Sequence, residues 1–326
     1  MFVPATRRPI QRGWTFGGLG LCVAALGLVA AATALGDDAL QVVSDASSSW
    51  VKAGGRPVMQ YFYVANPAKP YAAQLFSPGG VNVLRDSPLD HKHHHGLMFA
   101  VAVDGVDFWS ETEKCGLQKH AGGEEAKVRT IRDTRVAVGT QTQQIDWVGP
   151  GEGKLLMRET RTVAACRLPE GPVTLVGWRT RLEAPPGKDA ITLSGSTYFG
   201  LGMRFVQSMD VGGKFLNADG KTGVAGTNDA RSAWCACSAA ADGKPVTVAI
   251  FDFPTNPRHP ATWFTLDQGF AYLSATLNLS KQPLKIESGK PLSLRYAVAV
   301  WDGPVEKSKI DALYRRLLER MERKKP

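Results

Sequence analysis

Leu97-Met98-Phe99-Ala100-Val101-Ala102-Val103 is an uninterrupted apolar run, followed by Asp104-Gly105 and then by Val106-Asp107-Phe108-Trp109. A short apolar run that ends at an Asp-Gly pair is typical of a buried strand that enters a hairpin turn. The return segment carries an acid and two aromatic residues. We therefore predict a β-hairpin over residues 97–109, with its first strand buried.

Similar β-rich runs recur along the chain between breakers rich in glycine and proline, a pattern typical of a sandwich or barrel. They cover residues 58–64, 97–103, 144–148, 155–163, 173–182, 190–193, 246–251, 270–277 and 292–301. In residues 305–323 apolar side chains instead recur at three- and four-residue steps, which predicts an amphipathic helix. We predict an all-β fold, a large antiparallel β-sandwich with a C-terminal amphipathic α-helix, in a single domain over residues 37–326.

The first 36 residues resemble an export signal. Arg7, Arg8 and Arg12 precede an uncharged stretch, 13–36, which ends in small residues suited to cleavage. The same stretch is long enough to serve instead as an uncut membrane anchor. We expect an exported protein, periplasmic or extracellular, whose only membrane contact is through an uncleaved N-terminus.

Cleavage would lower the formal net charge from +9 to +6, because the leader contains three arginines and no acid. The remaining basic residues accompany no recognisable nucleic-acid module, so no nucleic-acid partner is predicted. Four cysteines remain, namely Cys115, Cys166, Cys235 and Cys237. An oxidising compartment would allow up to two disulfides, although Cys235 and Cys237 share one face of a strand and suit separate partners better.

Five of the six histidines lie between positions 91 and 120, and four belong to the run Asp90-His91-Lys92-His93-His94-His95-Gly96. Imidazole exchanges protons and binds metals near neutral pH. If the run is extended, His91, His93 and His95 project to one side. Two interpretations stay open: these histidines transfer protons in a sugar-sized cleft, or they form a metal site that His120 or a carboxylate completes.

Two further segments carry cations in defined settings. Three prolines between positions 254 and 260 hold Arg258 and His259 in place shortly before Trp263. This loop suits contact with a carbohydrate or an anion, and the alternative is a structural turn that pins two strands. In Tyr198-Phe199-Gly200-Leu201-Gly202-Met203-Arg204, the arginine either pairs with an internal carboxylate or holds a substrate oxygen.

Together these motifs resemble the bacterial PmoA-like family, which is often labelled "methane oxygenase PmoA". The resemblance rests on residues 87–97, 107–109, 198–204, 256–260 and 294–303, which occur in the family's order. The family's usual core, Asp-His-Pro-His-His-Arg-Gly, falls on residues 90–96, where Lys92 replaces the proline and His95 the arginine. The resemblance implies a sugar-processing protein. Because the chain has at most one hydrophobic span, a multi-span oxygenase complex is not predicted.

The chain also resembles galactose-mutarotase-type β-sandwiches, at His95-Gly96 and at Ser196-Thr197-Tyr198-Phe199. In those proteins the second motif begins with the catalytic histidine, and Ser196 stands in its place here. The resemblance therefore implies their large supersandwich fold, but not mutarotation by their usual pair of residues.

Our leading hypothesis is an exported enzyme that acts on a glycoside or modified sugar by histidine-assisted acid/base chemistry, as a hydrolase, lyase or isomerase. The predicted catalytic residues are His91, His93 and His94. The predicted substrate-binding residues are Asp90, Trp109, Arg204, Arg258, His259 and Trp263. One alternative is a non-catalytic carbohydrate-binding or cell-surface protein. The other is a metalloprotein that holds a divalent transition metal in the histidine run.

Overall fold

The computed structural model describes residues 39–64, 66–123, 125–131, 136–151, 153–168 and 171–322. The predicted export signal or anchor, residues 1–36, lies outside them. Within the described residues, no helix is both long enough and apolar enough to cross a membrane.

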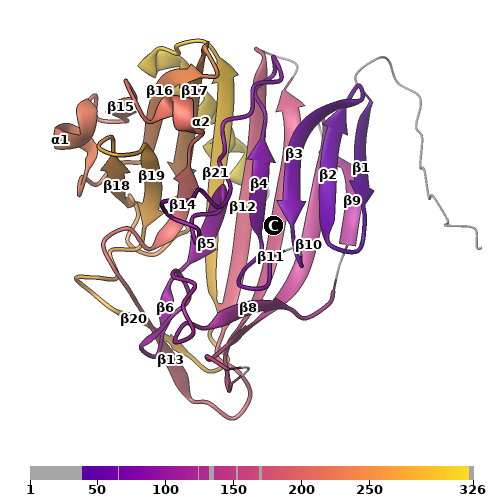
Figure 1. The fold of residues 1–326 in the computed structure, drawn as a ribbon, viewed down its shortest axis with the longest axis vertical. Coiled ribbons are helices and arrows are strands. Elements are labelled where there is room, and N and C mark those ends of the chain that lie inside the picture. The colour runs from indigo at the N-terminus through magenta and orange to yellow at the C-terminus, as the bar shows by residue number, and fades with distance from the viewer. Residues whose placement is uncertain are drawn as a thin grey trace, which may run out of the picture. The chain divides into compact units, whose positions relative to one another are not determined.

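Most of the regular structure consists of antiparallel strands in two large sheets (Figure 1). The eight-stranded sheet has the order β1 (Leu40–Ser44), β2 (Ser48–Ala53), β3 (Arg56–Phe62), β4 (Tyr71–Leu75), β5 (Leu97–Ala100), β14 (Gly200–Arg204), β19 (Tyr272–Thr276) and β18 (Thr262–Leu266). The nine-stranded sheet has the order β15 (Lys214–Asn217), β16 (Trp234–Ala241), β17 (Lys244–Asp252), β21 (Leu292–Asp302), β12 (Val173–Glu183), β11 (Leu155–Leu168), β10 (Ala137–Val148) and β8 (Leu117–His120), and β9 (Glu125–Thr130) also pairs with β10. A four-stranded sheet contains β20 (Leu284–Glu287), β13 (Ala190–Ser194), β6 (Ala102–Val103) and β7 (Val106–Asp107).

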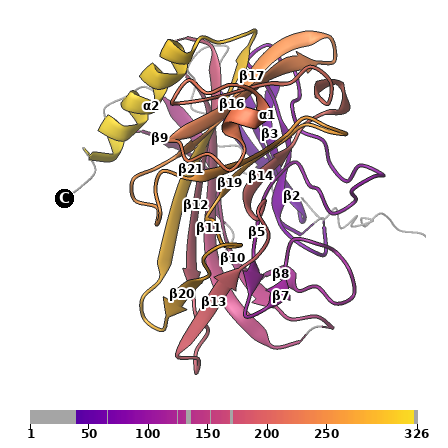
Figure 2. The same cartoon turned by 90° about the vertical axis from the view of Figure 1, so that its left-hand side faces the viewer.

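The two large sheets pack face to face, and Figure 2 shows them as two layers. Aromatic rings meet between the layers: Phe99 of β5 lies 6.2 Å from Trp147 of β10, between ring centroids. Because strand side chains alternate between faces, each strand contributes every second residue to this core. The predicted all-β sandwich is confirmed.

The C-terminal helix is also confirmed, with slightly shorter bounds than predicted. It is α2 (Lys307–Glu322), and the other two helical segments, η1 (Gln207–Met209) and α1 (Gly223–Thr227), are short. Ile310 and Leu313 of α2 are buried in a second apolar cluster. Figure 2 shows α2 on the side of the nine-stranded sheet that faces away from the eight-stranded sheet. The apolar stripe read from the sequence therefore covers the outside of the sandwich.

The hairpin predicted at residues 97–109 forms around the Asp104-Gly105 turn. Ala102 pairs with Asp107 and Val103 with Val106, while both turn residues have positive φ angles, as a tight hairpin turn requires. The apolar run is divided between two strands, because β5 joins the eight-stranded sheet and β6 the small one. Its residues are buried throughout, as predicted.

The four described cysteines are free, buried thiols, so the structure contains neither of the disulfides that the sequence would allow. Cys235 and Cys237 both face the sandwich core, and Ala236 between them faces the cluster beneath α2. The prediction that these two thiols share one face of a strand is confirmed.

Candidate functional site

One face of the eight-stranded sheet is turned away from the sandwich core, and we call it the outer face. On β14, Leu201 pairs with Phe99, which contacts the opposite sheet, so the alternating residues Gly202 and Arg204 lie on the outer face. Tyr272 of β19 lies directly opposite Arg204 and shares that face. A Cβ at Gly202 would stand 2.1 Å from the Tyr272 hydroxyl, so only glycine leaves room for it.

The histidine run forms a turn-rich loop over this face. The backbone N–H of His91 donates to Pro88 and that of His94 donates to His91, so the run turns twice and is not extended. The expectation that His91, His93 and His95 project to one side is therefore wrong. The rings of His91 and His94 stack instead, with centroids 4.7 Å apart, and His93 meets His94 edge-on at 4.6 Å.

His94 lies at the centre of a buried aromatic cluster on the outer face. Its ring centroid is 5.3 Å from that of Tyr272 and 6.2 Å from that of Trp109. The guanidinium of Arg204 lies 3.9 Å from the ring centroid of Phe270, which also contacts His91 and His94. We call the group His91, His93, His94, Trp109, Arg204 and Tyr272 the histidine site.

Four side chains of the histidine site are almost wholly buried and present polar atoms that have no hydrogen-bond partner among the described residues. Their exposed fractions are 6% for His94, 1% for Trp109, 1% for Arg204 and 2% for Tyr272. The unpartnered atoms are His94 Nδ1, Trp109 Nε1, the Nε and Nη1 of Arg204, and the Tyr272 hydroxyl. Each unmet buried group costs about 1–3 kcal/mol, so their convergence indicates a place built to bind polar groups from outside the chain.

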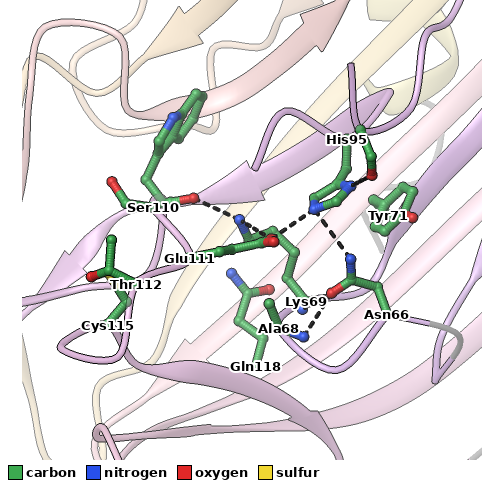
Figure 3. Close-up of polar contacts among 12 residues, drawn as sticks. Asn66, Ala68, Lys69, Tyr71, His95, Ser110, Glu111, Thr112, Cys115 and Gln118 are labelled. Atoms are coloured by element: carbon green, nitrogen blue, oxygen red, sulfur yellow. Dashed lines mark hydrogen bonds and ion pairs between the residues drawn. The ribbon is translucent and has the colours of Figure 1, made fainter. Parts of the chain in front are cut away.

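A network of charged side chains adjoins the histidine site, and Figure 3 shows its members Lys69, His95 and Glu111. The buried ring of His95 lies between two carboxylates: Nδ1 is 2.7 Å from Asp86 Oδ1 and Nε2 is 2.6 Å from Glu111 Oε1. Lys69 Nζ lies 2.9 Å from the same Glu111 oxygen and donates to the Trp109 carbonyl at 2.6 Å. We call Lys69, Asp86, His95 and Glu111 the carboxylate network, and Trp109 joins it to the histidine site.

The network holds Glu111 ionised. Burial alone would raise the pKa of this carboxyl, but the hydrogen bond from His95 and the charge of Lys69 outweigh burial and lower its pKa to about 2. Burial likewise opposes the charged form of His95, yet the hydrogen bonds to Asp86 and Glu111 raise its pKa. The network therefore favours the imidazolium form of His95, between two carboxylates.

The histidine site favours the opposite protonation state. Burial and, where they are protonated, the neighbouring imidazoles of His93 and His91 lower the pKa of His94 to about 3. Burial and the charge of Lys69 also lower the pKa of His93. His93 and His94 are therefore neutral imidazoles at pH 7, beside a fixed carboxylate, an arrangement that can accept a proton from a bound molecule.

Comparison with protein families decides the assignment of the chain, because residues 49–315 match the model of one family of unknown function. The chain belongs to DUF6807. The resemblance to PmoA-like proteins is thereby corrected: motifs that occur in the same order did not identify the family. No curated protein matches the DUF6807 chain.

Several solved structures are similar to this DUF6807 chain at low identity. An α-galactosidase from Lactobacillus brevis aligns with a TM-score of 0.44 and 6% identity, over 81% of this chain and 39% of that one. An α-galactosidase from Geobacillus stearothermophilus aligns with a TM-score of 0.39 and 11% identity, over 81% and 41%. The chain thus spans about two fifths of these proteins. A galactose mutarotase related enzyme from Lactobacillus acidophilus aligns with a TM-score of 0.35 and 8% identity, over 80% and 97%.

The structure brings six of the nine predicted site residues of the DUF6807 chain together. Besides His91, His93, His94, Trp109 and Arg204, the group includes Asp90, whose Oδ2 lies 2.9 Å from His91 Nδ1 and 3.3 Å from Arg204 Nη2. Of the two roles left open by the sequence, the structure shows the pairing of Arg204 with a carboxylate, while Nε and Nη1 have no hydrogen-bond partner among the described residues.

The other three predicted residues make structural contacts elsewhere, so their assignment to the site is corrected. Arg258 donates to the carbonyls of Leu277, Gln282 and Pro283, which pins the loop as a turn. His259 Nδ1 lies 2.7 Å from Asp252 at the end of β17. Trp263 faces the core and donates to the Ser232 carbonyl, so its ring is not open to a sugar.

The carboxylate network was not predicted as a unit. Lys69, Asp86 and Glu111 lie in unremarkable sequence, and His95 departs from the pattern on which the resemblance rested. The one sequence signal that could have identified the network was the proximity of Glu111 to Trp109 in the chain.

Among the described residues, no group of three or more His, Cys, Asp or Glu side chains is arranged to hold a metal ion, and His120 meets Gln143 instead. The metalloprotein alternative has no support in this geometry.

Proposed function

We propose that the protein is an enzyme that acts on a carbohydrate, with acid/base chemistry carried out by the histidine site beside Glu111. The observation that carries this proposal is the convergence of unpartnered polar atoms on buried His94, Trp109, Arg204 and Tyr272. Export, predicted from residues 1–36, stays part of the proposal as an expectation.

A sugar matches the chemistry of these atoms. Arg204 and Trp109 can only donate hydrogen bonds, whereas the neutral ring of His94 and the hydroxyl of Tyr272 can donate or accept. A sugar hydroxyl also donates and accepts, so one ring can satisfy several such groups at once. Beside them, the partly buried rings of His91 and Phe270 suit the apolar C–H face of a sugar ring.

His93 is the side chain best placed to move a proton. It is half-buried, and its ring nitrogens make no hydrogen bond within the described residues, unlike those of His91 and His95. Lys69 and His95 both meet one oxygen of Glu111, Oε1, at 2.9 and 2.6 Å. We assign proton transfer to His93, and to Glu111 the stabilisation of positive charge that develops next to it.

The proposal is tested by incubating the protein with a panel of glycosides and oxidised glycosides and analysing the mixtures by mass spectrometry. The expected result is a new product from at least one compound, whether by hydrolysis, elimination or isomerisation. A binding protein without turnover would retain affinity for the same compound and release it unchanged. Binding without product across the panel would contradict the enzymatic proposal and favour that alternative.

Replacement of Tyr272 by phenylalanine tests whether the unpartnered hydroxyl serves a ligand. We expect the free energy of unfolding to stay within about 1 kcal/mol of the parent or to rise, because the hydroxyl makes no hydrogen bond with the part of the chain that the structure describes. Affinity for the carbohydrate should fall roughly tenfold, the equivalent of one hydrogen bond. Urea denaturation and titration calorimetry measure the two quantities.

Tyr61→Phe is the matched control. Tyr61 is also a buried tyrosine of the same sheet, but its hydroxyl accepts a hydrogen bond from Gln143 Nε2 at 2.7 Å. Its removal should therefore destabilise the fold by about 1–3 kcal/mol, since a buried amide loses its partner. Equal destabilisation by the two replacements would show that the Tyr272 hydroxyl is structural.

A further inference from the structure

A cavity of about 370 Å³ lies beside the carboxylate network, over β3 and β4. Phe62 of β3 pairs with Tyr71 of β4, whose ring stacks on His95 with centroids 4.4 Å apart. Phe62 therefore lies on the outer face, and the alternating residue Gln60 and its partner Gln74 share that face. The cavity and the histidine site thus occupy the same side of the sheet.

Two side chains that line the cavity connect it to the carboxylate network and to the histidine site. Asp86 lines the cavity, binds His95 through Oδ1 at 2.7 Å and accepts from the Tyr71 hydroxyl through Oδ2 at 2.9 Å. Arg85 lines it too, and its Nη1 lies 3.7 Å from the Asp210 carboxylate, which also meets Arg204 at 3.6 Å. The cavity therefore adjoins the carboxylate network through Asp86 and reaches Arg204 of the histidine site through Arg85 and Asp210.

The lining of the cavity is polar and mostly neutral. Gln60, Gln74 and Gln207 all border it, and their side chains make no hydrogen bond within the described residues. Amides donate and accept at once, as neighbouring sugar hydroxyls do. Arg85 and Asp86 carry opposite charges, so the cavity does not select for an anion such as a phosphate. Its volume falls at the small end of ligand pockets and suits a monosaccharide-sized group, with Phe62 as an apolar wall.

We infer that this cavity is a second sugar-binding subsite and that the substrate is at least a disaccharide, which extends past Asp86 from the histidine site. This inference rests on the proposed function and narrows its substrate class. A monosaccharide would occupy either the histidine site or the cavity, whereas a longer glycan would occupy both and bind more tightly.

The test compares chain lengths on the full protein. Titration calorimetry is carried out with glucose, xylose and galactose and with defined di- and trisaccharides of each, in both α- and β-linked forms where these exist. For at least one series, the oligosaccharide should bind at least roughly tenfold more tightly than its monosaccharide. The double variant Gln60→Ala/Gln74→Ala should lose this gain and keep the affinity for the monosaccharide.

Gln144→Ala is the control, because Gln144 is an exposed glutamine on β10 of the other sheet. Gln74→Trp is a second variant, in which a larger side chain fills the cavity instead of truncating its lining. It should also abolish the rise in affinity with chain length. Thermal denaturation verifies that each variant is folded. The subsite would be overturned if both folded variants, Gln60→Ala/Gln74→Ala and Gln74→Trp, bound the oligosaccharide with unchanged affinity. It would also be overturned if affinity for the parent did not rise with chain length, or if no sugar bound.

Failure of the subsite and failure of the proposed enzyme give different results. If products form but chain length has no effect on affinity, the enzymatic proposal is supported and the subsite is contradicted. If no product forms but oligosaccharide binding depends on Gln60 and Gln74, the subsite is supported and the catalytic proposal is contradicted.

Discussion

Glu159→Ala is expected to lower the free energy of unfolding by about 3–5 kcal/mol, the largest effect on stability that we predict for any single replacement. Glu159 and Arg161 of β11 are an ion pair with both side chains fully buried, and Glu159 Oε1 lies 2.7 Å from Arg161 Nε. The same carboxylate accepts from Arg161 Nη2 at 2.9 Å and from the Trp147 indole at 2.8 Å. Removal of Glu159 would leave a buried guanidinium without a counter-charge.

Arg161 also connects this core to the candidate site. Its Nη1 donates to the Pro70 carbonyl at 2.8 Å and its Nη2 to Gln118 at 3.0 Å. Pro70 lies between Lys69 and Tyr71, one in the carboxylate network and the other stacked on His95. Loss of the ion pair should therefore disturb the position of Lys69 as well as stability.

Urea denaturation of Glu159→Ala and Asp146→Ala measures this effect against a matched control. Asp146 of β10 pairs with Arg158 at 3.7 Å, but the side chains are 35% and 53% exposed. An exposed pair of this kind contributes about 0–1 kcal/mol, so Asp146→Ala should remain close to the parent. Similar losses for the two variants would contradict the assignment of Glu159 to an essential buried pair.

The sequence predicts the parts of this fold that depend on local patterns. The hairpin at Asp104-Gly105 and the helix α2 follow from turn chemistry and from apolar periodicity, which neighbours in the chain determine. The histidine run and Arg204 were also found, because clustered imidazoles and an isolated cation are unusual against their surroundings.

The rest of the site depends on which strands become neighbours. Tyr272 reaches Arg204 only because β19 pairs with β14, and the hydroxyl fits only because position 202 is glycine. Lys69 and Glu111 are 42 positions apart and meet through tertiary packing, which no local pattern records. Conversely, the sequence predicted a binding role for Arg258 because a loop stiffened by prolines is equally compatible with a binding surface and with a structural turn.

His93→Gln is expected to lower kcat/KM on the substrate found in the glycoside panel by about 10²–10⁴-fold, the usual contribution of a positioned proton-transfer group. Stability should change little, because the ring is half-buried and makes no hydrogen bond within the described residues. Purified His93→Gln and parent are compared in steady-state kinetics, and each unfolding midpoint is measured in parallel. A variant that is folded and fully active would remove His93 from the mechanism.

The pH dependence separates a catalytic His93 from a structural one. Burial and the charge of Lys69 lower the pKa of His93, so the neutral ring is present at pH 7 and is lost as the pH falls through that lowered pKa. Activity should therefore fall with pH on the acid side of the pH–activity profile, which we call the acid limb.

Glu111 raises the pKa of His93, so Glu111→Gln should move the acid limb to lower pH as well as slow the reaction. Glu113→Gln, an exposed neighbour, should leave the limb in place. A limb that stays fixed in Glu111→Gln would mean that the titrating group is not His93, because removing a nearby negative charge must make an imidazolium release its proton more readily.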